Sequence, residues 1–102
     1  MIYETPEENE ELINCGGYCD VSAKCLHIRK YPESPGKCGD IAAWTNKVAR
    51  HEILHAFMYE SGLWSNGMCL DEESWAMNEE MIDWFAIQSS KIFKAFKAAG
   101  VL

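Results

Sequence analysis

The side chains best suited to chemistry lie in the stretch HEILH, residues 51–55. His51 and His55 are four positions apart, so on a helix they lie one above the other on the same face. Their imidazoles can bind one metal ion, and the carboxylate of Glu52 beside them can act as a general base. The alternative is an ordinary amphipathic helix on which two histidines are half exposed. The spacing alone does not decide between the two.

A catalytic zinc site needs a third protein ligand and an open position for water. One known extension of the motif places glycine at position 58 and histidine at position 61, but this chain has Met58 and Ser61 there. The other source of a ligand is a carboxylate on a following helix. NEEMID, residues 78–83, supplies such carboxylates at Glu79 and Glu80.

HEILH followed by Asn78, Glu79 and Asp83 resembles the gluzincins, the thermolysin-like class of zinc metallopeptidases, in a very small version. That class carries HExxH on one helix and N-E-x-x-x-D on the next. The resemblance implies one Zn²⁺ per chain, bound by His51, His55 and Glu79. It also implies that Asp83 accepts a hydrogen bond from the nitrogen of His51 that does not face the metal.

Glu80 competes with Glu79 for the role of third ligand. On a helix Glu79 and Asp83 share a face, and the small Ala76 and Ala86 beside them permit close contact with another helix. Glu80 instead shares its face with Trp84. The helical spacing therefore favours Glu79.

The activity that the resemblance implies is hydrolysis of a peptide or protein substrate. Zinc lowers the pKa of a bound water to about 7, so Glu52 can take its proton at neutral pH. We expect the substrate to lie extended along a strand that forms the rim of the cleft, at residues 25–29. His27 and Tyr59 are candidates for contacting the substrate or the transition state.

A competing hypothesis is a non-catalytic zinc module with a regulatory or partner-binding role. A small domain gains much folding energy from a metal, and Cys69 or a residue of the last helix could close the site. Glu52 argues against this hypothesis because structural zinc has no use for a base. A third hypothesis is a cysteine-rich redox or metal sensor built on the first third of the chain. The five cysteines are Cys15, Cys19, Cys25, Cys38 and Cys69.

The first 35 residues are turn-rich and predict a small, mostly antiparallel sheet. Residues 24–31 alternate in polarity like a half-exposed strand, and an earlier strand within residues 12–21 is expected to pair with it. The fold class is therefore α+β, with one domain spanning residues 1–102 and the sheet packed on two or three helices.

The helices follow in the second part of the chain. Asp40 is a suitable N-cap for the HExxH helix, which should run to Gly62. A glutamate helix should begin near Asp71, and residues 89–100 should form a short last helix. This last helix either covers the cleft and keeps the enzyme latent, or packs on the back of the sheet and completes the core. The four tryptophans are expected in the core and the cleft wall.

The net charge of −7 argues against nucleic acid as a partner, because binding to nucleic acid depends on neutralising phosphates. The first residues, MIYETPEENEE, lack the basic start and apolar run of a secretory signal, and no apolar run reaches the length needed to span a bilayer. The expectation is a cytoplasmic monomer that does not associate with membranes. In that compartment an odd number of cysteines predicts reduced thiols.

Overall fold

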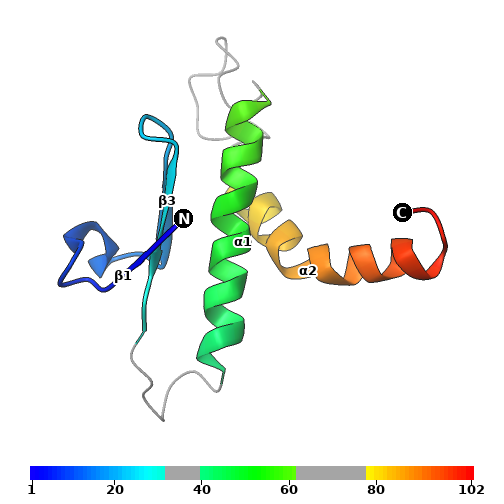
Figure 1. The fold of residues 1–102 in the computed structure, drawn as a ribbon, viewed down its shortest axis with the longest axis horizontal. Helices are drawn as coiled ribbons and strands as arrows, with labels where there is room; N and C mark the ends of the chain where they lie inside the picture. Colours follow the sequence, from blue (N-terminus) through cyan, green and yellow to red (C-terminus); the bar gives the residue numbers. More distant parts are fainter. Residues whose placement is uncertain (32–39, 62–77) are drawn as a thin grey trace.

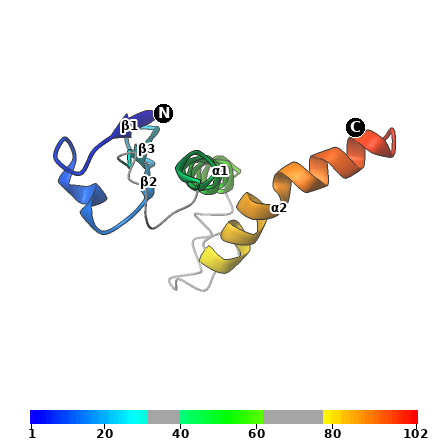
Figure 2. The same cartoon turned by 90° about the horizontal axis from the view of Figure 1, so that it is seen from below.

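The computed structural model describes residues 1–31, 40–61 and 78–102. Its elements, in chain order, are β1 (Ile2–Glu4), the 3-10 helix η1 (Glu10–Ile13), β2 (Gly17–Asp20), β3 (Cys25–Arg29), α1 (Ile41–Glu60) and α2 (Glu79–Ala98). This small sheet with two long helices confirms the predicted α+β class. Helix α1 lies between the sheet on one side and α2 on the other (Figures 1 and 2).

The sheet has the strand order β1-β3-β2, so β3 is its central strand. The expected hairpin is confirmed, because β2 pairs antiparallel with β3 and Gly17 lies opposite Ile28. Strand β1 pairs with the other edge of β3 in parallel, with Tyr3 opposite Ile28. The prediction of a mostly antiparallel sheet was therefore wrong in this detail, because the described sheet is mixed.

Helix α1 begins and ends where the sequence predicts. Asp40 caps it by accepting a hydrogen bond from the backbone N–H of Ala43 at 2.9 Å, and the helix ends at Glu60. Its buried Val48 and Ala49 pack with Ile28 of β3 to form the core between α1 and the sheet. One face of α1 is thus fixed against the sheet, which leaves the neighbouring face for α2.

Helix α2 is one continuous helix, which corrects the expectation of a break near residues 89–90. Asn78 caps it, because its side-chain oxygen accepts a hydrogen bond from the backbone N–H of Met81 at 2.7 Å. Neither glycine nor proline interrupts the helix before Gly100. Two serines cost a helix only a few tenths of a kcal/mol each relative to alanine, so the helix continues through them. The expected start near Asp71 lies outside the described residues.

The first half of α2 packs on α1. Ile82 and Ala86 are fully buried, and Arg50 of α1 donates from Nε to the carbonyl oxygen of Ala86 at 2.6 Å. A small residue at position 86 lets the backbones approach closely enough for this bond. The two helices are therefore held in a fixed crossing next to the start of α2.

The second half of α2 extends away from the rest of the molecule (Figures 1 and 2). It lies neither over the HExxH residues nor on the sheet, so both placements expected for the C-terminal segment were wrong in this structure. Trp84 is 54% exposed and so is not a core residue, whereas Trp44 lines the hollow described below. Trp64 and Trp75 lie outside the described residues.

Candidate metal centre

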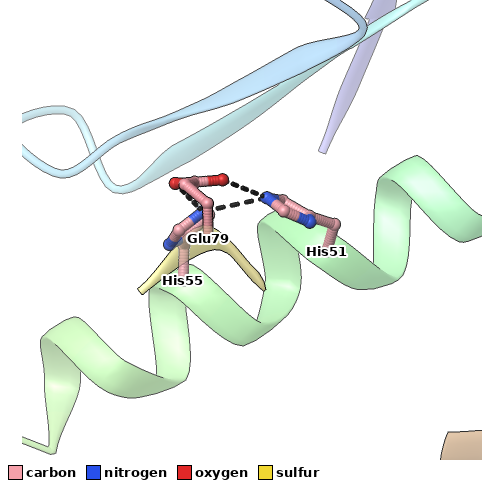
Figure 3. Close-up of side chains that lie close together, drawn as sticks. All are labelled: His51, His55 and Glu79. Atoms are coloured by element: carbon pink, nitrogen blue, oxygen red, sulfur yellow. Dashed lines mark hydrogen bonds and ion pairs between the residues drawn. The ribbon is translucent and has the colours of Figure 1, made fainter. Parts of the chain in front are cut away.

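Three donor side chains converge where α1 meets the start of α2. Nε2 of His51 lies 2.9 Å from Oε2 of Glu79, and Nε2 of His55 lies 3.0 Å from Oε1 of the same carboxylate. The two Nε2 atoms are 3.1 Å apart. Figure 3 shows both imidazoles and the carboxylate pointing toward one another. The ligand set inferred from sequence is thus brought together in space.

Local structure explains this convergence. The four-residue spacing places His51 and His55 on one face of α1, and their rings meet edge to face with centroids 4.8 Å apart. Glu79 is the first residue of α2, directly after its cap Asn78. The Arg50 bond to Ala86 fixes the crossing that points this end of α2 at the histidines.

The geometry of these donors fits a metal ion. Two ligands of a tetrahedral zinc ion with bonds of 2.0–2.1 Å lie about 3.3 Å apart. The donor separations here, 2.9–3.1 Å, are close to three corners of such a tetrahedron. The side chain of His55 is 7% exposed and that of His51 is 15% exposed, whereas Glu79 is 71% exposed. In such a site the protein buries the two histidines, whereas the Glu79 side is open to water.

Burial also favours the form of histidine that binds a metal. Removal from water lowers the pKa of His55, against an opposing pull from the Glu79 carboxylate. A neutral imidazole has a nitrogen lone pair to offer, whereas an imidazolium ion has none. His55 is therefore suited to bind a cation at neutral pH.

Glu52 is buried beside the three donors, with only 7% of its surface exposed. Burial raises its pKa to about 7; Glu79 adds to this rise and His51 opposes it. A carboxylate with a pKa near neutrality can both accept and return a proton, which is the requirement for a general base that later acts as an acid.

Strand β2 covers Glu52 because Gly17 has no side chain. A Cβ atom at Gly17 would lie 3.3 Å from Cγ of Glu52 and 3.2 Å from a methyl group of Val48. It would also lie only 2.9 Å from the carbonyl oxygen of His27. A larger residue at position 17 would push β2 away from α1, so this glycine is needed for the close approach.

A hollow of about 260 Å³ opens beside the donors. Its wall is contributed by the start of β2, one face of α1 and the first turns of α2. The lining residues are Gly16, Gly17, Trp44, Lys47, Val48, His51, Glu52, Glu79 and Asp83. The hollow joins the metal-binding residues to the β2 edge of the sheet.

Asp83 lies beside His51, as the sequence pattern implies. Its carboxylate also contacts Lys47, a residue that the sequence analysis did not single out. Oδ1 of Asp83 is 3.4 Å from Nδ1 of His51 and 2.8 Å from Nζ of Lys47. The hydrogen bond from Lys47 is the main reason that the pKa of Asp83 is lowered, with His51 contributing less. Lys47 is one turn before His51 on α1, but nothing in that spacing shows that Asp83 of α2 lies beside it.

Other predicted contacts do not reach this site. Nδ1 of His27 lies 2.6 Å from Oε1 of Glu4, and the ring of His27 stacks on that of Tyr18. His27 is not among the residues that line the hollow. Tyr59 lines a different hollow, between α1 and the β2–β3 hairpin. Glu80 is exposed and outside the donor group, so Glu79 is the carboxylate that meets the histidines.

The rim strand was also assigned wrongly. Strand β3 is the central strand, because β1 pairs with its residues 27–29 along one edge and β2 pairs with its residues 25–28 along the other. It therefore does not offer a continuous open edge to a peptide. Strands β1 and β2 are the two edge strands, and Gly17 at the start of β2 lines the hollow.

The cysteines that the structure describes are free thiols. They are Cys15, Cys19 and Cys25, while Cys38 and Cys69 lie outside the described residues. Within the described ranges, the group of side chains able to hold a metal is His51, His55 and Glu79, and it includes no cysteine. Burial raises the pKa of Cys19, which disfavours the thiolate form that binds metals.

Comparison with known proteins gives no match to the chain, whether against protein-family models, curated proteins or solved structures. Neither α1 nor α2 is both long and apolar enough to span a membrane. What can be inferred about function therefore comes from the geometry of the site.

Proposed function

We propose that this protein is a zinc-dependent peptidase of the gluzincin type. The observation that carries the proposal is a buried Glu52 directly beside three converging donors, two on α1 and one at the start of α2. A site that only holds a metal for stability needs the donors and has no need of an unshared buried carboxylate next to them.

Each residue has a defined role in this proposal. His51, His55 and Glu79 hold the ion, which when bound supplies an activated water and polarises the substrate carbonyl. Glu52 accepts the proton released in the attack and returns it to the leaving amine. Asp83 accepts a hydrogen bond from Nδ1 of His51, which fixes the tautomer that leaves Nε2 free to bind.

The substrate in this proposal is a peptide segment in extended conformation beside β2. Edge strands offer unpaired backbone N–H and C=O groups, and an extended peptide can add to them as a further strand. Gly16 and Gly17 bring this edge to the wall of the same hollow as Glu52. Trp44, 43% exposed at the hollow, offers an aromatic surface for a substrate side chain.

The second candidate is a non-catalytic zinc module. It is favoured by the position of the donors, because an ion bound to His51, His55 and Glu79 would join two helices whose shared core contains few buried residues. Binding energy would then add to folding energy without any reaction.

Zinc analysis and a peptide-cleavage screen on the wild type and Glu52→Gln test the proposal together. The substitution keeps the size of the side chain and removes its basicity, so cleavage should fall by about 10²–10⁴-fold. Zinc content should stay at one per chain, and Glu80→Gln, the neighbouring exposed acid on α2, should match the wild type.

Two results would decide against a peptidase. If Glu52→Gln cleaves as fast as the wild type, Glu52 is not the base. If the wild type holds zinc but cleaves no peptide, and chelation lowers its melting temperature, the protein is the non-catalytic module.

A further inference from the structure

The outer half of α2 carries an apolar surface that the described part of the chain leaves uncovered. We call it the tail face: the exposed Phe93 and Phe96, with the half-buried Ile92 beside them. Phe93 is 57% exposed and Phe96 is 46% exposed. Helical spacing places the tail face in line with Ile82, which is fully buried against α1. One apolar stripe therefore runs along α2, and only its first half has a partner within the described residues.

The charge beside the tail face is positive. Lys91, Lys94 and Lys97 are spaced along the same half of the helix, and no acidic residue follows Asp83. Since the whole chain carries −7 and residues 84–102 carry +3, the remaining residues carry −10. No ion pair joins these lysines to another described residue, so their charge is available to an anionic partner.

The opposite end of the molecule has the complementary character. We call it the acidic end: Glu7, Glu10, Glu11 and Ile13. All four residues are exposed, and Ile13 is 57% exposed. On the one-turn helix η1, Glu10 and Ile13 are three residues apart, so a carboxylate and an apolar side chain share one side.

The acidic end is held firmly on the sheet. Leu12, between its members, is fully buried. The guanidinium of Arg29 donates from Nη1 to the carbonyl oxygens of Leu12 and Ile13, at 3.0 and 3.1 Å. A partner that docks here would meet a surface that is already ordered, which lowers the entropy cost of binding.

The two surfaces cannot meet within one chain, because the N-terminal segment and the outer half of α2 lie at opposite ends of the molecule (Figure 2). We propose that the tail face of one copy docks on the acidic end of a second copy. Lysines would then face glutamates, and Phe93 and Phe96 would cover Ile13. Under two-fold symmetry the contact occurs twice, which doubles the buried area.

Charge complementarity favours this occupant over an anionic membrane. A bilayer would attract the three lysines but would repel the −10 carried by the rest of the chain. It would also leave the acidic end without a partner. A second copy matches both surfaces at once.

A charge-swap experiment on the full-length protein tests the proposal. The tail variant is Lys91→Glu, Lys94→Glu and Lys97→Glu; the end variant is Glu7→Lys, Glu10→Lys and Glu11→Lys. In sedimentation velocity the wild type should shift from monomer toward dimer as its concentration rises. Each variant alone should associate at least about 10-fold more weakly, because like charges then meet.

The equimolar mixture of the two variants gives the decisive result. It should recover association, since each acidic tail meets a basic end, and the recovered complex should weaken when salt screens the charges. A shift restored in the mixture but absent in both separate variants cannot come from a general change in folding. The double variant Phe93→Ser and Phe96→Ser should remain monomeric without any change of charge.

Three results would overturn the proposal. They are a wild type that stays monomeric over the whole concentration range, a mixture that associates no better than its components, and a monomer that binds vesicles containing phosphatidylserine but not vesicles of phosphatidylcholine alone. The last result would assign the tail face to an anionic membrane surface. None of these variants alters the metal-binding residues, so a failure here leaves the peptidase proposal untouched.

Discussion

The two halves of α2 have the same amphipathic pattern and opposite surroundings. The inner half begins with Glu79, buries Ile82 and Ala86 against α1, and is held by the bond from Arg50. The outer half presents Phe93 and Phe96 to solvent. Helical periodicity thus shows which side of a helix is apolar, whereas the position of the neighbouring helix decides how much of that side is buried.

The largest difference between the halves should appear in metal binding. The double variant His51→Ala and His55→Ala removes two of the three donors that meet the inner half, and we expect zinc content to fall from one per chain to near zero. The variant Phe93→Ala, in the outer half, should keep its zinc. Elemental analysis of both proteins measures this, and unchanged zinc in the histidine variant would exclude the site.

The next largest difference should appear in folding stability. Ile82→Ala removes a fully buried side chain from the inner half and should lower the free energy of unfolding by about 2–5 kcal/mol. Phe93→Ala removes a larger but exposed side chain and should change it by less than about 0.5 kcal/mol in the monomer. Urea unfolding at low protein concentration compares them. Equal losses would mean that the outer half is buried in the folded monomer.

A smaller effect is expected at Asp83, still within the inner half. Asp83→Ala removes the carboxylate next to Nδ1 of His51 and should weaken zinc affinity by about 10–100-fold. Glu80→Ala, a neighbouring acid that faces solvent, should leave the affinity unchanged. A chelator competition on the two variants decides, and the opposite ranking would show that the wrong carboxylate was assigned.

The smallest effect should come from the sheet, away from both halves of α2. Hydrogen bonds from His27 and then Asn9 lower the pKa of Glu4 below its usual 4.5. A carboxyl group whose pKa is lower in the folded than in the unfolded chain stabilises the fold at any pH above its unfolded-state pKa. This stabilisation is lost as the pH falls through the folded-state pKa. Glu4→Gln should therefore lower the urea midpoint slightly at pH 7, and the difference should vanish at a pH well below 4.5, where the carboxyl is protonated in the folded and the unfolded chain. A difference that grows toward low pH would contradict this sign.

The sequence predicted the parts that depend on local spacing. The bounds of α1 followed from Asp40 and the absence of breakers before Gly62, and the approach of His51 to His55 followed from the helical repeat. The pairing of Glu79 with them came from the resemblance to a two-helix motif. Each of these depends on residues close together in the chain or on a known pattern.

The parts that depend on long-range packing could not be predicted in the same way. Residues 25–29 alternate like any half-buried strand, and nothing in that alternation says that β1 pairs along one edge and β2 along the other. Gly17 falls within the strand expected over residues 12–21, but nothing in the sequence shows that its missing side chain lets β2 approach Glu52. Lys47 has no signature of its own, because its role comes from where Asp83 lies in space.

The separation of the donors along the chain has a thermodynamic consequence for the whole domain. His51 and Glu79 are 28 positions apart, so an ion held by both would act as a cross-link that closes a long loop. By the chain-entropy relation used for disulfides, closing a loop of this length removes about 3–4 kcal/mol of freedom from the unfolded chain. Chelation would therefore also lower the free energy of unfolding of the domain. Amide hydrogens that exchange only through global unfolding, in β3 as well as in the inner half of α2, would then exchange faster, whereas those of the outer half of α2 would exchange at nearly the same rate.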